Sequence, residues 1–146
     1  MAGRVPGWRG VWMRDTLPPR PRAGEAGVLN LDSSDNPGTH WTAWRVAPKA
    51  ILYFDSYGCP PPKEFVTYLR SIWTPQAKPL HCSTMAIQRP GDPPFCGHLC
   101  VEFLKRALTP PLTIPLLELR EAADKLRHRS AGGGRPLDIG SLAALS

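Results

Sequence analysis

Four residues with complementary chemistry follow one another along the 146-residue chain: a histidine, an aspartate, a glutamine and a cysteine. His40 can act as a base, Asp55 can orient its ring, Gln88 can donate a hydrogen bond to an oxyanion, and the Cys96 thiol can attack a carbonyl. These are the parts that a thiol protease needs. The order therefore predicts such a site, provided that the elements of the fold bring the four side chains together.

Two β-like runs carry the histidine and the aspartate. Residues 39–46 and 51–55 are rich in Trp, Tyr, Ile and Val, and the hairpin-length loop 47–50 separates them. With a four-residue loop, His40 and Asp55 lie on one face as diagonal neighbours, about 7–8 Å apart at Cα. A three-residue loop or a bulge would place them on opposite faces.

The clearest helical pattern in the chain begins at the cysteine. Apolar residues recur at helical spacing at Cys96, Leu99, Cys100, Phe103, Leu104, Ala107 and Leu108. Two prolines precede the pattern, so Cys96 falls in the first turn, where the helix dipole and free N–H groups favour a thiolate. Gly97 leaves room for a substrate carbonyl. Gln88, at the end of an expected strand 81–88, can add its amide to the oxyanion hole.

At these residues the chain resembles the adenovirus endopeptidase (adenain) group of cysteine proteases, in the superfamily that includes the SUMO-specific proteases. The resemblance lies in the motifs Gly38-Thr-His-Trp41, Tyr53-Phe-Asp-Ser-Tyr-Gly58, Gln88 and Cys96-Gly-His-Leu-Cys100 with Phe103-Leu104. It implies that His40 is the base, Asp55 orients it, Gln88 is the oxyanion donor and Cys96 is the nucleophile. It also implies that Trp41 shapes a narrow substrate channel.

The chain departs from that group in two respects. The adenovirus enzymes have Glu where this chain has Asp55, although Asp is usual elsewhere in the superfamily. They are stimulated by a small disulfide-linked peptide and by DNA, but neither Cys59 nor Cys82 matches the linking cysteine by motif. No cofactor is therefore predicted, and an activating peptide stays unidentified.

Composition indicates one compact domain, with 42% hydrophobic and 21% charged residues. No apolar run approaches the roughly 18 residues of a membrane span, which argues against a membrane partner, and the first 30 residues lack a signal-peptide pattern. We interpret the 4 cysteines as reduced thiols. These features predict an intracellular reducing compartment, which would be the host nucleus or a virion if the protein is viral.

The predicted fold is α+β, with a mixed or antiparallel central sheet packed on the helix that begins at Cys96. Helical spacing also predicts a helix over 63–73 and a last helix that opens at 113–115. The expected organisation is a basic proline-rich N-terminal arm (1–26), a papain-like or adenain-like protease core (27–108), a C-terminal helix (109–131) and a flexible tail (132–146).

The predicted function is a cysteine endopeptidase acting on polypeptides, and the family resemblance adds cleavage after small residues by a viral or mobile-element maturation protease. Two alternatives stay open. One is a deconjugating protease of a ubiquitin-like protein. The other is a basic DNA-binding or packaging protein with a protease-like fold, since the net charge of +6 permits weak nonspecific DNA binding through the N-terminal arginines. Zinc is disfavoured because the cysteines and histidines lack ligand-pair spacing.

Overall fold

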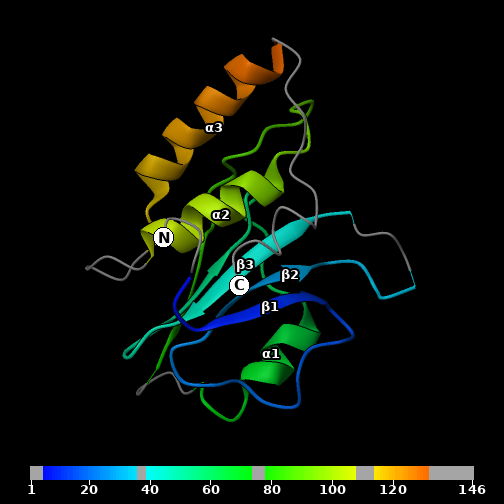
Figure 1. The fold of residues 1–146 in the computed structure, drawn as a ribbon, viewed down its shortest axis with the longest axis vertical. Helices are drawn as coiled ribbons and strands as arrows, with labels where there is room; N and C mark the ends of the chain where they lie inside the picture. Colours follow the sequence, from blue (N-terminus) through cyan, green and yellow to red (C-terminus); the bar gives the residue numbers. More distant parts are fainter. Residues whose placement is uncertain (1–4, 36–38, 74–77, 108–113, 132–146) are drawn as a thin grey trace.

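The computed structural model describes residues 5–35, 39–73, 78–107 and 114–131, which form one five-stranded sheet and three helices (Figure 1). The strands lie in the sheet in chain order. Adjacent strands are parallel at the two outer pairs and antiparallel at the two inner pairs. Along the chain the elements are β1 (Trp8–Met13), β2 (Ala26–Asn30), β3 (Trp41–Val46), β4 (Ile51–Phe54), α1 (Lys63–Leu69), β5 (Leu80–Cys82), α2 (Cys96–Arg106) and α3 (Leu116–Ala131). The architecture is α+β with a mixed sheet, as predicted.

The β3–β4 hairpin has the register that a four-residue loop requires. Val46 lies opposite Ile51, and the N–H group of Ala47 donates to the carbonyl of Ala50 at 2.8 Å, which closes the turn. Side chains alternate between the two faces of a sheet, so this register decides which face receives each residue beyond the open end of the hairpin.

Alternate residues of β4 enter two separate hydrophobic cores. Leu52 and Phe54 join the core beneath α2 and α3, whereas Ile51 and Tyr53 join the core against α1. Phe54 stacks on Phe103 of α2 with 5.3 Å between ring centroids. The sheet therefore lies between α2 and α3 on one face and α1 on the other (Figure 1).

The helix α2 begins at Cys96, as predicted, and its apolar face packs on the sheet. The predicted last residue, Leu108, is outside the described residues. In α3, Leu119 and Ala123 are fully buried in the same core, which fixes α3 against α2. No helix within the described ranges is long and apolar enough to cross a membrane.

The segment 1–26, expected as an extended arm, supplies a strand of the sheet. β1 pairs in parallel with β2, and Val5 is buried in the core beneath α2. Trp8 and Val11 pack against the same core. The prediction emphasised prolines and arginines, but burial of these apolar side chains favours a paired strand over a solvated arm. The tail expected over 132–146 lies outside the described residues.

Two of the arginines expected to serve DNA binding are engaged in the fold. Arg9 forms an ion pair with Glu25 at 3.1 Å, and Arg14 lies 3.8 Å from Glu64. Weak DNA binding by this segment stays a prediction.

The helix expected over 63–73 is shorter than predicted. It ends at Leu69, whose carbonyl accepts hydrogen bonds from the N–H groups of both Ile72 and Trp73. Ile72 and Trp73 still pack on the core against α1. The turn after Leu69, and not a longer helix, therefore brings these two partly buried side chains against the core.

The strand expected over 81–88 is also shorter, because the chain leaves the sheet after Cys82. The N–H groups of Ile87 and Gln88 both donate to the carbonyl of Ser56, at 2.8 and 2.9 Å. These bonds replace the ladder that a longer strand would have formed. They hold Gln88 beside the end of β4.

We expect Glu25→Ala to destabilise the fold by about 3 kcal/mol. Glu25 is 1% exposed and accepts hydrogen bonds from Trp44 Nε1 at 2.8 Å, Tyr68 Oη at 2.7 Å and Arg9 Nη1 at 3.1 Å. Its removal leaves the partly buried Arg9 guanidinium, the N–H group of Arg22 and the buried Trp44 and Tyr68 donors without this acceptor. Chemical denaturation measures the loss. The matched control is Glu64→Ala, which removes an exposed ion pair and should cost under about 1 kcal/mol. Equal losses of unfolding free energy in the two variants would show that the buried contacts of Glu25 add no stability beyond a surface ion pair.

Candidate active site

Cys96 occupies the first position of α2, with Phe95 as the N-cap residue. The unpaired N–H groups and the positive dipole end of a helix N-terminus stabilise an anion there. The first turn of α2 contains no acidic side chain to oppose this effect. The residue is 4% exposed, so its thiol lies at the edge of the core instead of on the open surface.

His40 directly precedes β3 and Asp55 directly follows β4, and the hairpin register places them side by side. Nε2 of His40 lies 2.8 Å from Oδ1 of Asp55. The carboxylate is buried, and Oδ1 also accepts the N–H group of Tyr57 at 2.8 Å. Its second oxygen, Oδ2, has no hydrogen-bond partner in the described part of the chain. A positive charge on His40 therefore compensates a buried negative charge.

The turn after β4 packs closely around this pair. The Tyr57 ring lies 4.8 Å from the His40 ring, centroid to centroid, and Tyr57 is 42% exposed. The turn closes with a 2.8 Å hydrogen bond from the N–H group of Gly58 to the Asp55 carbonyl. Gly58 has a positive φ of 72°, and a Cβ there would lie 2.9 Å from the Thr84 carbonyl. A glycine is therefore required at this close approach.

The three ionisable side chains favour an ion pair between cysteine and histidine. Burial opposes a charge on His40, but hydrogen bonds and charges from Asp55 and Cys96 outweigh it and raise the pKa of His40 to about 9. Burial likewise opposes a thiolate, but hydrogen bonds from His40 and from the backbone of Trp41 and Gly97 lower the pKa of Cys96. A thiolate next to an imidazolium is the nucleophilic form of such a pair.

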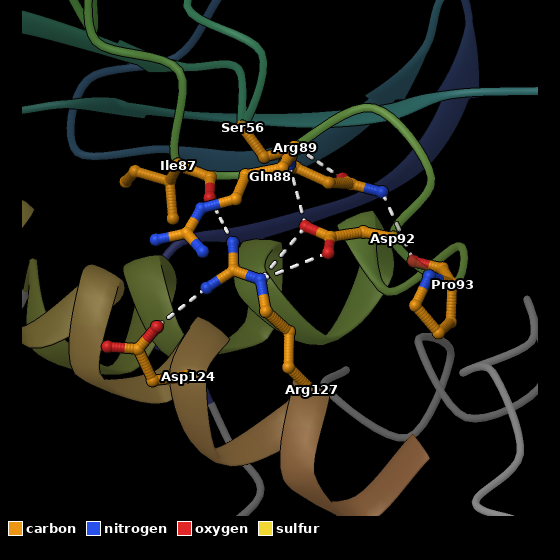
Figure 2. Close-up of polar contacts among 8 residues, drawn as sticks. All are labelled: Ser56, Ile87, Gln88, Arg89, Asp92, Pro93, Asp124 and Arg127. Carbon is orange, nitrogen blue, oxygen red and sulfur yellow. Dashed lines mark hydrogen bonds and ion pairs between the residues drawn. The ribbon is translucent and has the colours of Figure 1, made fainter. Parts of the chain in front are cut away.

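Gln88 is 2% exposed and its amide is held at both ends (Figure 2). Its Oε1 accepts the Ser56 hydroxyl at 2.8 Å, and its Nε2 donates to the Pro93 carbonyl at 3.3 Å. An amide nitrogen has two hydrogens, so one is left for a further acceptor. The arrangement suits an oxyanion donor.

Trp41 and Gly97 were predicted to line the substrate channel. Their backbone amides hydrogen-bond the Cys96 thiolate, while the Trp41 side chain packs on the core beneath α2 and remains partly exposed. Their contact with substrate stays a prediction.

Sequence reasoning missed three residues that hold the predicted ones in place. Ser56 orients Gln88, and Tyr57 packs on His40. Ser83 accepts the N–H group of Asp55 at 2.9 Å and donates its hydroxyl to the Asp55 carbonyl at 3.0 Å. The first two stand in the Asp-Ser-Tyr-Gly motif itself, which was a usable signal, whereas Ser83 has no local signal at all.

The second cysteine of α2 differs from the first. Cys100 is fully buried, and burial together with the charges of Cys96 and Asp55 raises its pKa well above that of an ordinary thiol. It packs as a small apolar side chain. Among the described residues, no three His, Cys, Asp or Glu side chains are grouped as metal ligands.

Comparison with known proteins bears on the fold. No protein-family model and no curated protein matches the chain. It is similar to the crystal structure of the ASFV pS273R protease in its selenomethionine form, with a TM-score of 0.50 and 21% identity over 73% of this chain and 45% of that one. A second crystal structure of the ASFV pS273R protease gives a TM-score of 0.41 at 21% identity, over 86% and 43%.

The first of these likenesses shows that the chain shares the fold of a protease. The chain spans less than half of the length of the protein it matches. The narrower resemblance to adenovirus endopeptidase, on the motifs given above, stays a prediction.

We expect iodoacetamide to label Cys96 at pH 6 about tenfold faster than the exposed Cys59, because the His40 ion pair keeps the Cys96 sulfur as a thiolate. Peptide mass spectrometry measures the two rates in the native protein. His40→Ala should remove the preference, whereas Cys100→Ala should leave it unchanged. Unchanged labelling of Cys96 in His40→Ala would contradict the ion pair.

We expect the His40 ring to titrate near pH 9, and Asp55→Asn to lower that value. An amide still accepts the ring N–H but cannot stabilise its positive charge, so the proton leaves at lower pH. NMR titration of the imidazole measures both proteins. An unchanged midpoint in Asp55→Asn would show that the carboxylate does not govern the charge on His40.

Proposed function

We propose that this chain is a cysteine endopeptidase with Cys96 as its nucleophile. The observation that carries the proposal is the position of His40, which bonds Asp55 through Nε2 while its side chain also hydrogen-bonds Cys96. Because Asp55 occupies Nε2, Nδ1 is the ring nitrogen left for the thiol. Orienting acid, base and nucleophile thus form one chain of contacts, with the thiol at a helix N-terminus.

The groups support a two-step hydrolysis. The Cys96 thiolate forms a bond to the scissile carbonyl carbon, and the carbonyl electron pair moves to oxygen, where the free Nε2 hydrogen of Gln88 can stabilise it. His40 gives its proton to the leaving amine as the C–N bond breaks. A water molecule then gives a proton to His40 and attacks the thioester, which releases the acid product and restores the thiolate.

The substrate class is polypeptide, and cleavage after small residues is the specificity that the adenain resemblance implies. The fold shared with the ASFV pS273R protease supports a viral maturation protease in general terms. Free Cys59, Cys82, Cys96 and Cys100 suit a reducing intracellular compartment. The runner-up is a deconjugating protease, which would cleave after the C-terminal glycine of a folded ubiquitin-like protein instead of within an unfolded peptide.

We expect Cys96→Ala to abolish hydrolysis of fluorogenic peptides with Gly-Gly before the scissile bond, with the fold retained. Cys100→Ala should keep its activity, apart from a packing cost of about 1–2 kcal/mol. His40→Ala should lower kcat more than Asp55→Asn, because an amide still orients the ring. Circular dichroism checks that each variant is folded.

A panel of substrates distinguishes the endopeptidase from the deconjugating protease and from an inactive packaging protein. Hydrolysis of short peptides supports the endopeptidase, whereas cleavage restricted to a ubiquitin-like protein fused at its C-terminus supports the deconjugating enzyme. If Cys96→Ala retained activity while Cys100→Ala lost it, the nucleophile would be wrongly assigned. A wild-type protein without activity on either substrate would favour the packaging protein with a protease-like fold.

A further inference from the structure

The loop between Gln88 and Cys96 has to hold both ends of the site without regular secondary structure of its own. Its turn is closed twice over: the N–H group of Asp92 donates to the Arg89 carbonyl at 3.0 Å, and the N–H group of Arg89 donates to Asp92 Oδ2 at 2.6 Å. Gly91 adopts a positive φ of 85° at the tip. These contacts shape the turn, but they do not attach it to the rest of the fold.

Arg127 of α3 makes that attachment (Figure 2). Its Nε lies 3.0 and 3.1 Å from the two carboxylate oxygens of Asp92, and its Nη2 donates to the carbonyl of Ile87 at 2.6 Å. Its third nitrogen, Nη1, donates to Asp124 of its own helix at 2.6 Å, and the guanidinium lies 5.9 Å from the centre of the Phe95 ring. One side chain therefore touches the residue before Gln88, the turn, and the residue before Cys96.

The side chains that make these contacts are largely buried, unlike those of an ordinary surface ion pair. The side chain of Arg127 is 19% exposed and that of Asp92 is 10% exposed. A planar guanidinium can serve a carboxylate and a carbonyl at once, which an ammonium cannot do with the same geometry. Burial opposes ionisation of Asp92, yet the hydrogen bonds from Arg127 and Arg89 lower its pKa.

The helix that carries Arg127 is itself fixed, because Leu119 and Ala123 are fully buried against the core beneath α2. Their burial sets the position of α3 relative to the sheet and to α2. Arg127 transmits that position to the loop.

We propose that Arg127 is a positioning residue, which clamps the loop from Ile87 to Phe95 so that the Gln88 amide faces the Cys96 thiol. The proposal rests on the endopeptidase function and extends it, because it makes α3 a part of the catalytic unit and not an appendage to a core of 27–108. Arg127 acts through the loop and touches none of the reacting atoms.

The first test is amide hydrogen exchange across residues 87–95 in wild type and in Arg127→Met, which keeps the apolar stem of the side chain. We expect exchange in this loop to rise by at least about tenfold, while amides of the β3–β4 hairpin keep their wild-type rates. The matched control is Arg120→Met, which replaces an exposed arginine of the same helix. It should leave the exchange rates of both the loop and the hairpin unchanged. Unchanged exchange in the loop would overturn the clamp.

The second test is a double-mutant cycle on peptide hydrolysis between Arg127→Met and Gln88→Ala. Gln88→Ala should lower kcat about 100- to 1,000-fold, and Arg127→Met about 10- to 100-fold with little change in KM. If Arg127 acts through Gln88, the double variant is no slower than Gln88→Ala alone, within about threefold. If instead the loss of kcat in the double variant equalled the product of the two single-variant losses, the proposal would be overturned.

Asp92→Asn guards against a folding defect, because it keeps the shape of the side chain and removes its charge. It should raise hydrogen exchange in the loop and lower kcat, as Arg127→Met does, but by a smaller factor. In both variants the rate of iodoacetamide labelling of Cys96 should stay within about threefold of wild type. Equal losses of labelling and hydrolysis would indicate a general collapse of the site and contradict the clamp. An inactive wild-type protein would refute the endopeptidase function, whereas the exchange experiment would still decide whether Arg127 holds the loop.

Discussion

The antiparallel register of β3 and β4 is the constraint on which the rest of the site depends. A slip by one residue would turn every side chain of β4 to the other face, and would exchange Leu52 and Phe54 for Ile51 and Tyr53 in the core beneath α2. The two cores thus hold the hairpin in one register from both sides. In that register the residues just beyond its open end, His40 and Asp55, come within 2.8 Å of each other.

Burial then turns this proximity into electrostatics. The Asp55 carboxylate is removed from water with one oxygen unpartnered among the described residues, so the adjacent ring is most stable with a positive charge. The Cys96 sulfur meets that charge from the other side, at the start of a helix that Phe103 anchors to Phe54 of the hairpin. The same packing that stabilises the fold therefore sets the distance between the His40 ring and the Cys96 thiol.

The Gln88 side of the candidate site depends on contacts of much longer range. Gln88 is oriented by Ser56, from the turn after β4, and its loop is held by Arg127, from the last described helix. Neither contact belongs to the sheet. The site is thus assembled from a rigid half on the hairpin and α2 and a second half whose geometry depends on tertiary hydrogen bonds.

Local patterns in the sequence were sufficient for several features. Helical spacing located α2 and its first residue, and the register that a four-residue loop at 47–50 would give is the one observed, although a three-residue loop or a bulge stayed open. The motifs around His40, Asp55 and Cys96 identified residues that the structure brings together. These features succeed because each depends on neighbours a few residues apart, where periodicity and turn length leave few alternatives.

Only the tertiary structure decided the remainder. The proline-rich start of the chain forms β1, where Trp8 and Val11 find a core to pack against. The strand expected over 81–88 ends at Cys82, and the N–H groups of Ile87 and Gln88 bond the Ser56 carbonyl instead of a neighbouring strand. The contact between Arg127 and Ile87 joins residues 40 positions apart. A sequence shows which groups need partners. Which distant partner satisfies a buried donor or charge is decided by how the whole chain packs, and no local pattern contains that information.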